Sequence, residues 1–90
     1  MYKRDLSKKN EAVLTDIKNR VQIRYAAEDR YGYWIIWNNT TKEGFVGIEP
    51  QTWLSNAPCF AERGIQGLGI IEVLPNTEET LTTTIQVEKI

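Results

Sequence analysis

Histidine is absent from this sequence, and cysteine occurs once, as Cys59. Histidine is the commonest general base and metal ligand, so its absence excludes the usual nucleophile–histidine–carboxylate triads. A single cysteine forms no internal disulfide, and a structural zinc site needs more cysteine or histidine ligands than the chain has. We interpret Cys59, beside Phe60, as a small buried hydrophobic residue rather than a nucleophile. The residue inventory therefore favours a protein without catalytic chemistry.

Long hydrophobic runs are also missing. The longest apolar stretches are far too short to span a bilayer, and the N-terminus lacks the apolar segment of a signal peptide. With one cysteine, nothing requires an oxidising compartment. We therefore expect a cytoplasmic protein without membrane contact, in which the Asn-x-Thr sequences at Asn38 and Asn39 belong to a turn and carry no glycan.

A strong excess of charge of one sign is the third absence. The net charge is −1, whereas domains that bind nucleic acid strongly usually have a pI above about 9. We therefore do not expect a nucleic-acid partner. Residues 1–30 nevertheless hold eight Lys and Arg against five Asp and Glu, and residues 31–90 hold three against seven. We interpret this asymmetry as a solvated basic helix on a mildly acidic sheet; the alternative is a basic face that meets an acidic partner or phosphates.

The 90 residues predict one domain, residues 1–90, in which residues 1–5 are a short lead that can be flexible. A domain this small buries a modest core, to which its nine aromatic residues contribute. We predict an α+β fold: a mainly antiparallel sheet of about five strands, an N-terminal helix packed on one face, and a short helix after a central hairpin.

The central hairpin is predicted from residues 31–48. Side chains alternate along a strand, so the two faces of its first half both carry large apolar groups: Tyr31, Tyr33, Ile35 and Trp37 on one, Trp34 and Ile36 on the other. A strand that is apolar on both faces belongs in the middle of a sheet. The polar residues 38–44 then turn the chain, and residues 45–48 return beside the first strand.

The N-terminal helix is predicted over about Ser7 to Asn19. Ser7 is a suitable N-cap and Asn19 a suitable stop. The apolar stripe at helical spacing consists of Val13, Leu14, Ile17 and Val21. We expect this stripe to pack on the sheet, the alternative being a helix that binds a partner.

The other elements follow from changes of periodicity. Residues 21–26 alternate as a half-buried strand, although a continued helix is the alternative there. Residues 49–56 predict a helix of one or two turns with Pro50 at its first position, and Pro58 argues against its extension. Residues 57–67 then form a long loop, which is where functional residues are often found. A strand over residues 68–74, a turn at 75–79 and an edge strand over 80–89 complete the chain.

Clustered glycines mark the end of that loop. Glycine lets backbone N–H groups approach a phosphate, and Arg63 would add charge. No Walker or dinucleotide-binding pattern is present. The plainer interpretation is that Gly64 and Gly67 adopt positive φ, and that Gly69 marks a bulge or a close approach.

These patterns favour a non-enzymatic interaction protein that forms a homodimer or a higher oligomer through an aromatic sheet face or a sheet edge. Its contact residues would be Trp34, Trp37, Trp53 and Phe60, with Arg63 as the polar contact. The alternative is a pocket for a nucleotide or phosphate, built from Arg63, Gly64, Gln66 and Gly67 against an aromatic wall. A metal-dependent enzyme using paired carboxylates ranks third; its candidates are Glu43, Glu49, Glu62, Glu72, Glu78 and Glu79. We expect no cofactor.

Overall fold

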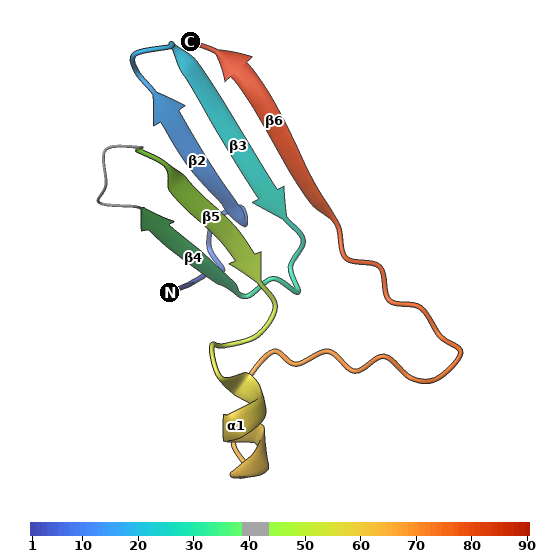
Figure 1. The fold of residues 1–90 in the computed structure, drawn as a ribbon. Coiled ribbons are helices and arrows are strands. Elements are labelled where there is room, and N and C mark those ends of the chain that lie inside the picture. The colour runs from blue at the N-terminus through green and yellow to red at the C-terminus, as the bar shows by residue number, and fades with distance from the viewer. Residues whose placement is uncertain (39–43) are drawn as a thin grey trace.

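The computed structural model describes residues 1–38 and 44–90, which form two three-stranded antiparallel sheets and one short helix (Figure 1). The elements are β1 (Tyr2–Lys3), β2 (Glu11–Asp16), β3 (Val21–Ala27), β4 (Tyr33–Asn38), β5 (Val46–Gln51), α1 (Ala57–Glu62) and β6 (Thr83–Lys89). The first sheet has the strand order β1-β4-β5, and the second has the order β2-β3-β6. The predicted α+β fold with one sheet of about five strands is therefore wrong.

The predicted N-terminal helix is wrong as well, because its residues form β2 and the turns on either side. The carboxylate of Asp16 accepts hydrogen bonds from the backbone N–H and the side-chain amide of Asn19, at 3.1 and 2.8 Å. These bonds close a turn in which Arg20 has a φ of 54°, and β2 then pairs with β3 along its whole length. Asx turns of this kind compete with helix, and here strand pairing favours the turn. Ile17, a member of the predicted helical stripe, is 82% exposed in that turn.

Ser7 likewise belongs to a turn and does not cap a helix. Its backbone N–H and its hydroxyl both donate to a carboxylate oxygen of Asp5, at 2.9 and 2.6 Å. The bond from the hydroxyl, followed by that from the N–H, lowers the pKa of Asp5 below its ordinary value of 3.8. The segment that contains Ser7 thus connects β1 of the first sheet to β2 of the second.

The central hairpin and the strand that precedes it are confirmed. β4 lies between β1 and β5, as a strand with apolar side chains on both faces requires. Residues 21–26 fall within β3. Most of the predicted turn over residues 38–44, including the sequence at Asn39, lies at residues 39–43, outside the described residues.

The predicted short helix is displaced along the chain. Residues 49–51 continue β5, where Pro50 lies opposite Trp34. Proline donates no ladder hydrogen bond, and β5 tolerates it because β5 is an edge strand. α1 instead begins at Ala57, within the predicted loop, and accommodates Pro58 in its first turn, where an N–H has no helical partner. The predicted helix start at Pro50 is therefore wrong, and so is the predicted loop at residues 57–62, where Pro58 belongs to a helix.

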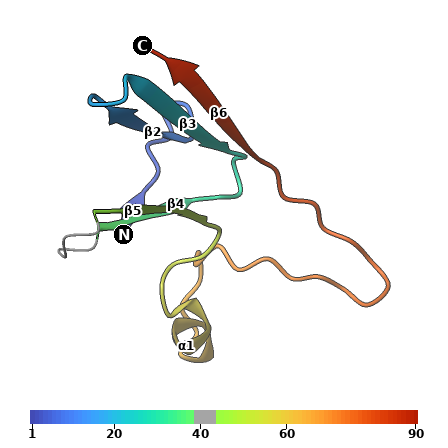
Figure 2. The ribbon, with the colours of Figure 1, turned by 45° about the horizontal axis from the view of Figure 1, so that its top comes forward.

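The predicted strand over residues 68–74 does not form. The turn after it does: Thr77 donates from its backbone N–H and its hydroxyl to the carbonyl of Leu74, at 3.2 and 2.6 Å. β6 confirms the predicted last strand over a shorter range and lies at the edge of the second sheet. Residues 70–82, which we call the arm, form an extended loop that projects away from both sheets (Figures 1 and 2). β6 pairs with β3 on one side, and its other edge pairs with no described strand, so the predicted last hairpin is absent.

The core is small, and only part of it lies where the two sheets meet, since Ala57 belongs to α1. The buried hydrophobic residues among those described are Trp34, Ala57 and Leu68. The ring of Trp34, on the first sheet, meets the ring of Tyr25, on the second, edge to face with centroids 5.7 Å apart. From this junction the sheets diverge at a steep angle (Figure 2). No helix in the described ranges is long and apolar enough to cross a membrane.

Candidate interaction surfaces

The outer face of the second sheet is polar and its side chains bond one another. Arg24 Nη1 donates to Glu11 Oε1 at 3.1 Å, and the amide of Gln22 donates to the hydroxyl of Thr15 at 3.1 Å. Each of these pairs joins β2 to β3 across the ladder. A face whose hydrogen-bonding groups are satisfied in this way is suited to solvent.

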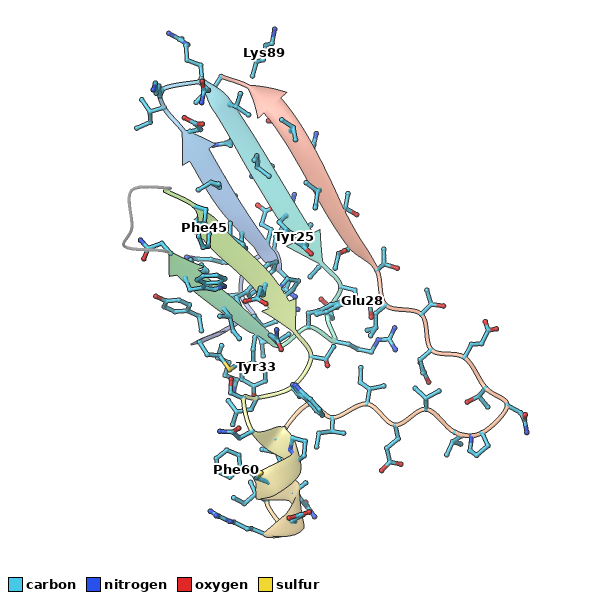
Figure 3. All side chains as sticks on the ribbon, in the orientation of Figure 1. Tyr25, Glu28, Tyr33, Phe45, Phe60 and Lys89 are labelled. Atoms are coloured by element: carbon cyan, nitrogen blue, oxygen red, sulfur yellow. The ribbon has the colours of Figure 1, made fainter. Side chains whose placement is uncertain are left out.

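The inner face of the same sheet is apolar and only partly covered. Cross-strand register places one residue from each strand side by side in two rows, which consist of Ala12, Tyr25 and Ile85, and of Leu14, Ile23 and Val87. The first sheet covers this face near Tyr25 (Figure 3). On β6 the apolar side chains remain open, with Ile85 61% and Val87 65% exposed. An aliphatic row of this kind on a sheet edge is a typical protein contact.

The free edge of β6 presents backbone groups from alternate residues. The N–H of Glu28 bonds the carbonyl of Thr82, and the N–H of Ile90 bonds that of Arg20, at 3.1 and 3.0 Å. Thr82 and Ile90, at the two ends of β6, are both even-numbered. Hydrogen-bonded pairs alternate with non-bonded pairs along an antiparallel ladder, so the even-numbered residues of β6 bond β3. The outward N–H and C=O groups therefore belong to Thr83, Ile85, Val87 and Lys89.

A cavity of about 330 Å³ lies between the sheets, and we call it the inter-sheet cleft. Its apolar walls come from the inner faces of both sheets and include Leu14, Trp34, Ile36, Val46 and Ile48. Its charged lining, which we call its mouth, consists of the basic side chains of Lys3, Arg4, Lys8 and Lys9 and the acidic side chains of Asp5 and Glu11. Its size and its apolar walls with convergent polar groups are typical of a binding site.

Asn10 fixes the geometry of this cleft, and no motif or periodicity in the sequence marks this residue. The side chain is 8% exposed and accepts a hydrogen bond from Trp34 Nε1 at 2.8 Å. Its NH₂ group donates to the carbonyls of Glu28 and Tyr31, at 3.0 and 2.7 Å. One amide thus ties the β1–β2 connection to the β3–β4 turn and to the central tryptophan.

The arm is anchored at its C-terminal end by Glu28 and Arg30. The Arg30 guanidinium donates to the Glu28 carboxylate, to Glu79 at 3.0 Å and to the carbonyl of Thr80. The N–H of Thr82 donates to Glu28 Oε2 at 2.8 Å. The bond from Arg30, followed by that from Thr82, lowers the pKa of Glu28 below its ordinary value of 4.5. Figure 3 shows Glu28 beside the chain that leads into β6.

The four predicted aromatic contacts do not form one patch. Trp34 lies inside, whereas Trp37 lies on the opposite face of β4, where its Nε1 donates to Glu49 at 2.9 Å. Trp37 also covers Gly47 and meets Phe45 edge to face at 5.1 Å. Trp53 is partly exposed after β5, and Phe60 is half-buried in α1. Trp37 and Trp53 therefore remain candidates for surface contacts, while Trp34 belongs to the core.

The predicted phosphate loop follows α1. Gly64 and Gly67 have positive φ, 80° and 73°, as the plainer interpretation required. The close approach predicted at Gly69 is confirmed, since a Cβ there would lie 2.0 Å from the carbonyl oxygen of Thr52. A shallow hollow is lined by Gln66 and Gly67, but Arg63 is not among its lining residues. The loop thus brings together only part of the predicted site.

Two other sequence-based interpretations concern reactive groups. Cys59 is exposed, so the prediction that it is a buried hydrophobic residue is wrong; it lies in α1, which packs on the rest of the chain through Ala57. Within residues 1–38 and 44–90, no three or more Cys, Asp and Glu side chains gather in a way that could hold a metal ion.

Comparison with known proteins adds no assignment to these surfaces, since no known family model matches the chain and no solved structure matches it significantly.

Proposed function

We propose that this protein is a non-enzymatic interaction protein that assembles with further copies of itself. One observation carries the proposal. The chain exposes 7343 Å², whereas a folded monomer of 10.4 kDa exposes about 5,400 Å². Its radius of gyration is 15.9 Å, against about 12 Å for a compact domain of 90 residues.

The excess of exposed area has the size of an interface. It amounts to about 1,900 Å² per chain. Standard interfaces bury about 800 Å² on each partner, and those of obligate homodimers bury about 1,000–2,500 Å². Exposed aliphatic side chains contribute to this area, among them Val73, Leu74, Ile85 and Val87 on the arm and on β6, which are each more than half exposed. An obligate interface is apolar in the same way.

The free edge of β6 supplies a self-complementary contact. If two β6 strands pair antiparallel about a two-fold axis at Gln86, Ile85 of one copy lies opposite Val87 of the other. Lys89 then lies opposite Thr83, and Glu88 lies opposite Thr84, so no like charges meet. Each of the four outward-facing residues on one β6 edge then pairs with a residue on the other, and the two apolar rows continue across the axis. This register fits the symmetric interface of most homodimers.

Trp37 and Trp53 belong to the proposal as further contact residues, because exposed tryptophans often dominate binding energy. We place the assembly in the cytoplasm, on the grounds that a single cysteine requires no oxidising compartment.

Sedimentation velocity and native mass spectrometry over a concentration series test the proposal. We expect a dimer or a larger closed assembly whose mass is a multiple of 10.4 kDa. A monomer at every concentration, with a radius of gyration of 15–16 Å in solution scattering, would overturn self-assembly while leaving the fold intact.

A further inference from the structure

The arm is held at both ends and presents its tip to solvent. At its start, the N–H of Leu54 bonds the carbonyl of Leu68 at 2.9 Å, and Gly69 packs against the backbone of Thr52. At its end, Arg30 bonds Glu79 and the carbonyl of Thr80. These contacts at its two ends fix the direction in which the tip projects.

The tip combines apolar and acidic side chains. Val73 and Leu74 are 59% and 64% exposed and lie beside the turn that Thr77 closes. Glu72 and Glu78 flank them, and the arm holds no Lys or Arg. Ordering an extended segment costs conformational entropy, and apolar side chains held in water do not offset that cost. The tip therefore has the character of one half of an interface.

The inter-sheet cleft has the complementary character. Its walls are aliphatic and aromatic, and its mouth holds four basic side chains against the two acidic ones of Asp5 and Glu11, which leaves a positive excess. Arg4 pairs with Asp29 at 2.8 Å and Glu11 pairs with Arg24 at 3.1 Å, whereas Lys3, Lys8 and Lys9 form no ion pair with a described residue. Lys8 lies within electrostatic range of Asp5, and Lys3 and Lys9 add further positive charge for carboxylates that approach the mouth.

We propose that the arm of one copy inserts its tip into the inter-sheet cleft of a second copy. Val73 and Leu74 contact the apolar walls, and Glu72 and Glu78 lie against the lysines of the mouth. The cleft of about 330 Å³ lies within the range of ordinary binding sites, about 300–1,000 Å³, and offers apolar walls to two aliphatic side chains. The inference rests on the proposed self-assembly and names a contact for it.

The occupant is a second copy because the chain cannot reach its own cleft. The arm's two ends are fixed near β5 and at the end of β3, and in both views the arm projects away from the side where β2 lies (Figures 1 and 2). The basic mouth belongs to residues 1–30, which carry the positive excess, and the acidic tip belongs to residues 31–90. Opposite potentials of this kind direct association and fix the register of the partners.

A disulfide between two differently tagged chains tests the contact. In a Cys59→Ser background, one chain carries Val73→Cys and the other carries Ile36→Cys; they are co-expressed, purified through both tags and oxidised mildly. We expect a rapid crosslink between the two tagged chains. In the matched control, Ile17→Cys replaces Ile36→Cys, because Ile17 is more exposed and does not line the cleft; this pair should crosslink at least tenfold more slowly.

A charge exchange gives an independent readout. We expect the pair Lys8→Glu and Lys9→Glu to weaken association by about tenfold or more at low salt, since several rim charges act together. Adding Glu72→Lys and Glu78→Lys should restore the affinity. A parent protein that is monomeric would overturn the proposed function itself. A parent that assembles, with equal crosslinking in both pairs and no effect of charge, would overturn the arm contact alone.

Discussion

The indole Nε1 of Trp34 donates a hydrogen bond to Asn10 Oδ1 at 2.8 Å, where the two sheets meet. Asn10 is the only buried polar residue among the described residues. The rest of the Asn10 amide is also satisfied, by two backbone carbonyls of the β3–β4 turn. A fully satisfied buried amide fixes one arrangement of the elements around it. The angle between the sheets, and with it the inter-sheet cleft, therefore depends on this residue.

Replacing Asn10 with alanine should lower the free energy of unfolding by about 2–4 kcal/mol, because it leaves an indole N–H and two carbonyls without partners. Urea unfolding at a fixed protein concentration measures the change. Lys18→Ala, at an exposed position that does not line the cleft, is the control and should change the value by less than about 0.5 kcal/mol. An Asn10→Ala variant as stable as this control would show that the junction is not needed for the fold.

Gly69 and Gly64 form a matched pair, because both have a φ near 80°. A Cβ at Gly69 would lie 2.0 Å from the carbonyl oxygen of Thr52, whereas one at Gly64 meets nothing within 4 Å. We therefore expect Gly69→Ala to cost about 2–4 kcal/mol and Gly64→Ala only about 1 kcal/mol, the ordinary cost of positive φ. Equal losses in parallel urea titrations would contradict the close packing at the start of the arm.

The central hairpin could be predicted because its signals are local. Alternation along residues 31–37 and the polar turn after them specify strand pairing between neighbours in the sequence. The N-terminal segment had no such signal. Val13, Leu14 and Ile17 satisfy a helical period, yet only Leu14 lies on the inner face of the sheet, because pairing with β3 outweighs helical propensity.

The arm and the junction depend on contacts that the sequence does not display. Residues 68–74 have the composition of a strand, yet no described strand pairs with them, although the outer edge of β6 is free. Asn10 carries no pattern of its own, since its partners lie 18 to 24 residues away. The uneven charge of the two parts of the chain was the one signal in the sequence that bears on the proposed docking of the arm.

Acid should loosen the anchored end of the arm. The pKa of Glu28 is below its ordinary value of 4.5, so its carboxylate stabilises the fold fully above pH 4.5, and this contribution is lost as the pH falls through the lowered pKa. Asp5 and Asp16 behave alike, because their pKa values are also lowered by local hydrogen bonds. We therefore expect Glu28→Gln to be less stable than the parent at pH 7 and to lose less stability between pH 5 and pH 3. If the melting temperatures of the parent and of Glu28→Gln fall by the same amount between pH 5 and pH 3, Glu28 does not have this role.

The β6 edge can be separated from the fold by the position of one proline. The N–H of Val87 faces the free edge, so Val87→Pro removes a hydrogen bond between copies and none within the chain. The N–H of Gln86 faces β3, so Gln86→Pro breaks the ladder within the chain. We expect Val87→Pro to keep the circular dichroism of the parent but to sediment as a smaller species, and Gln86→Pro to lose stability by about 3 kcal/mol. Val87→Ala, which keeps the N–H, is the control for the side chain and should still assemble, with weaker affinity. An assembly unchanged by Val87→Pro would mean that β6 edges do not pair, and the exposed arm and tryptophans would then have to supply the whole interface.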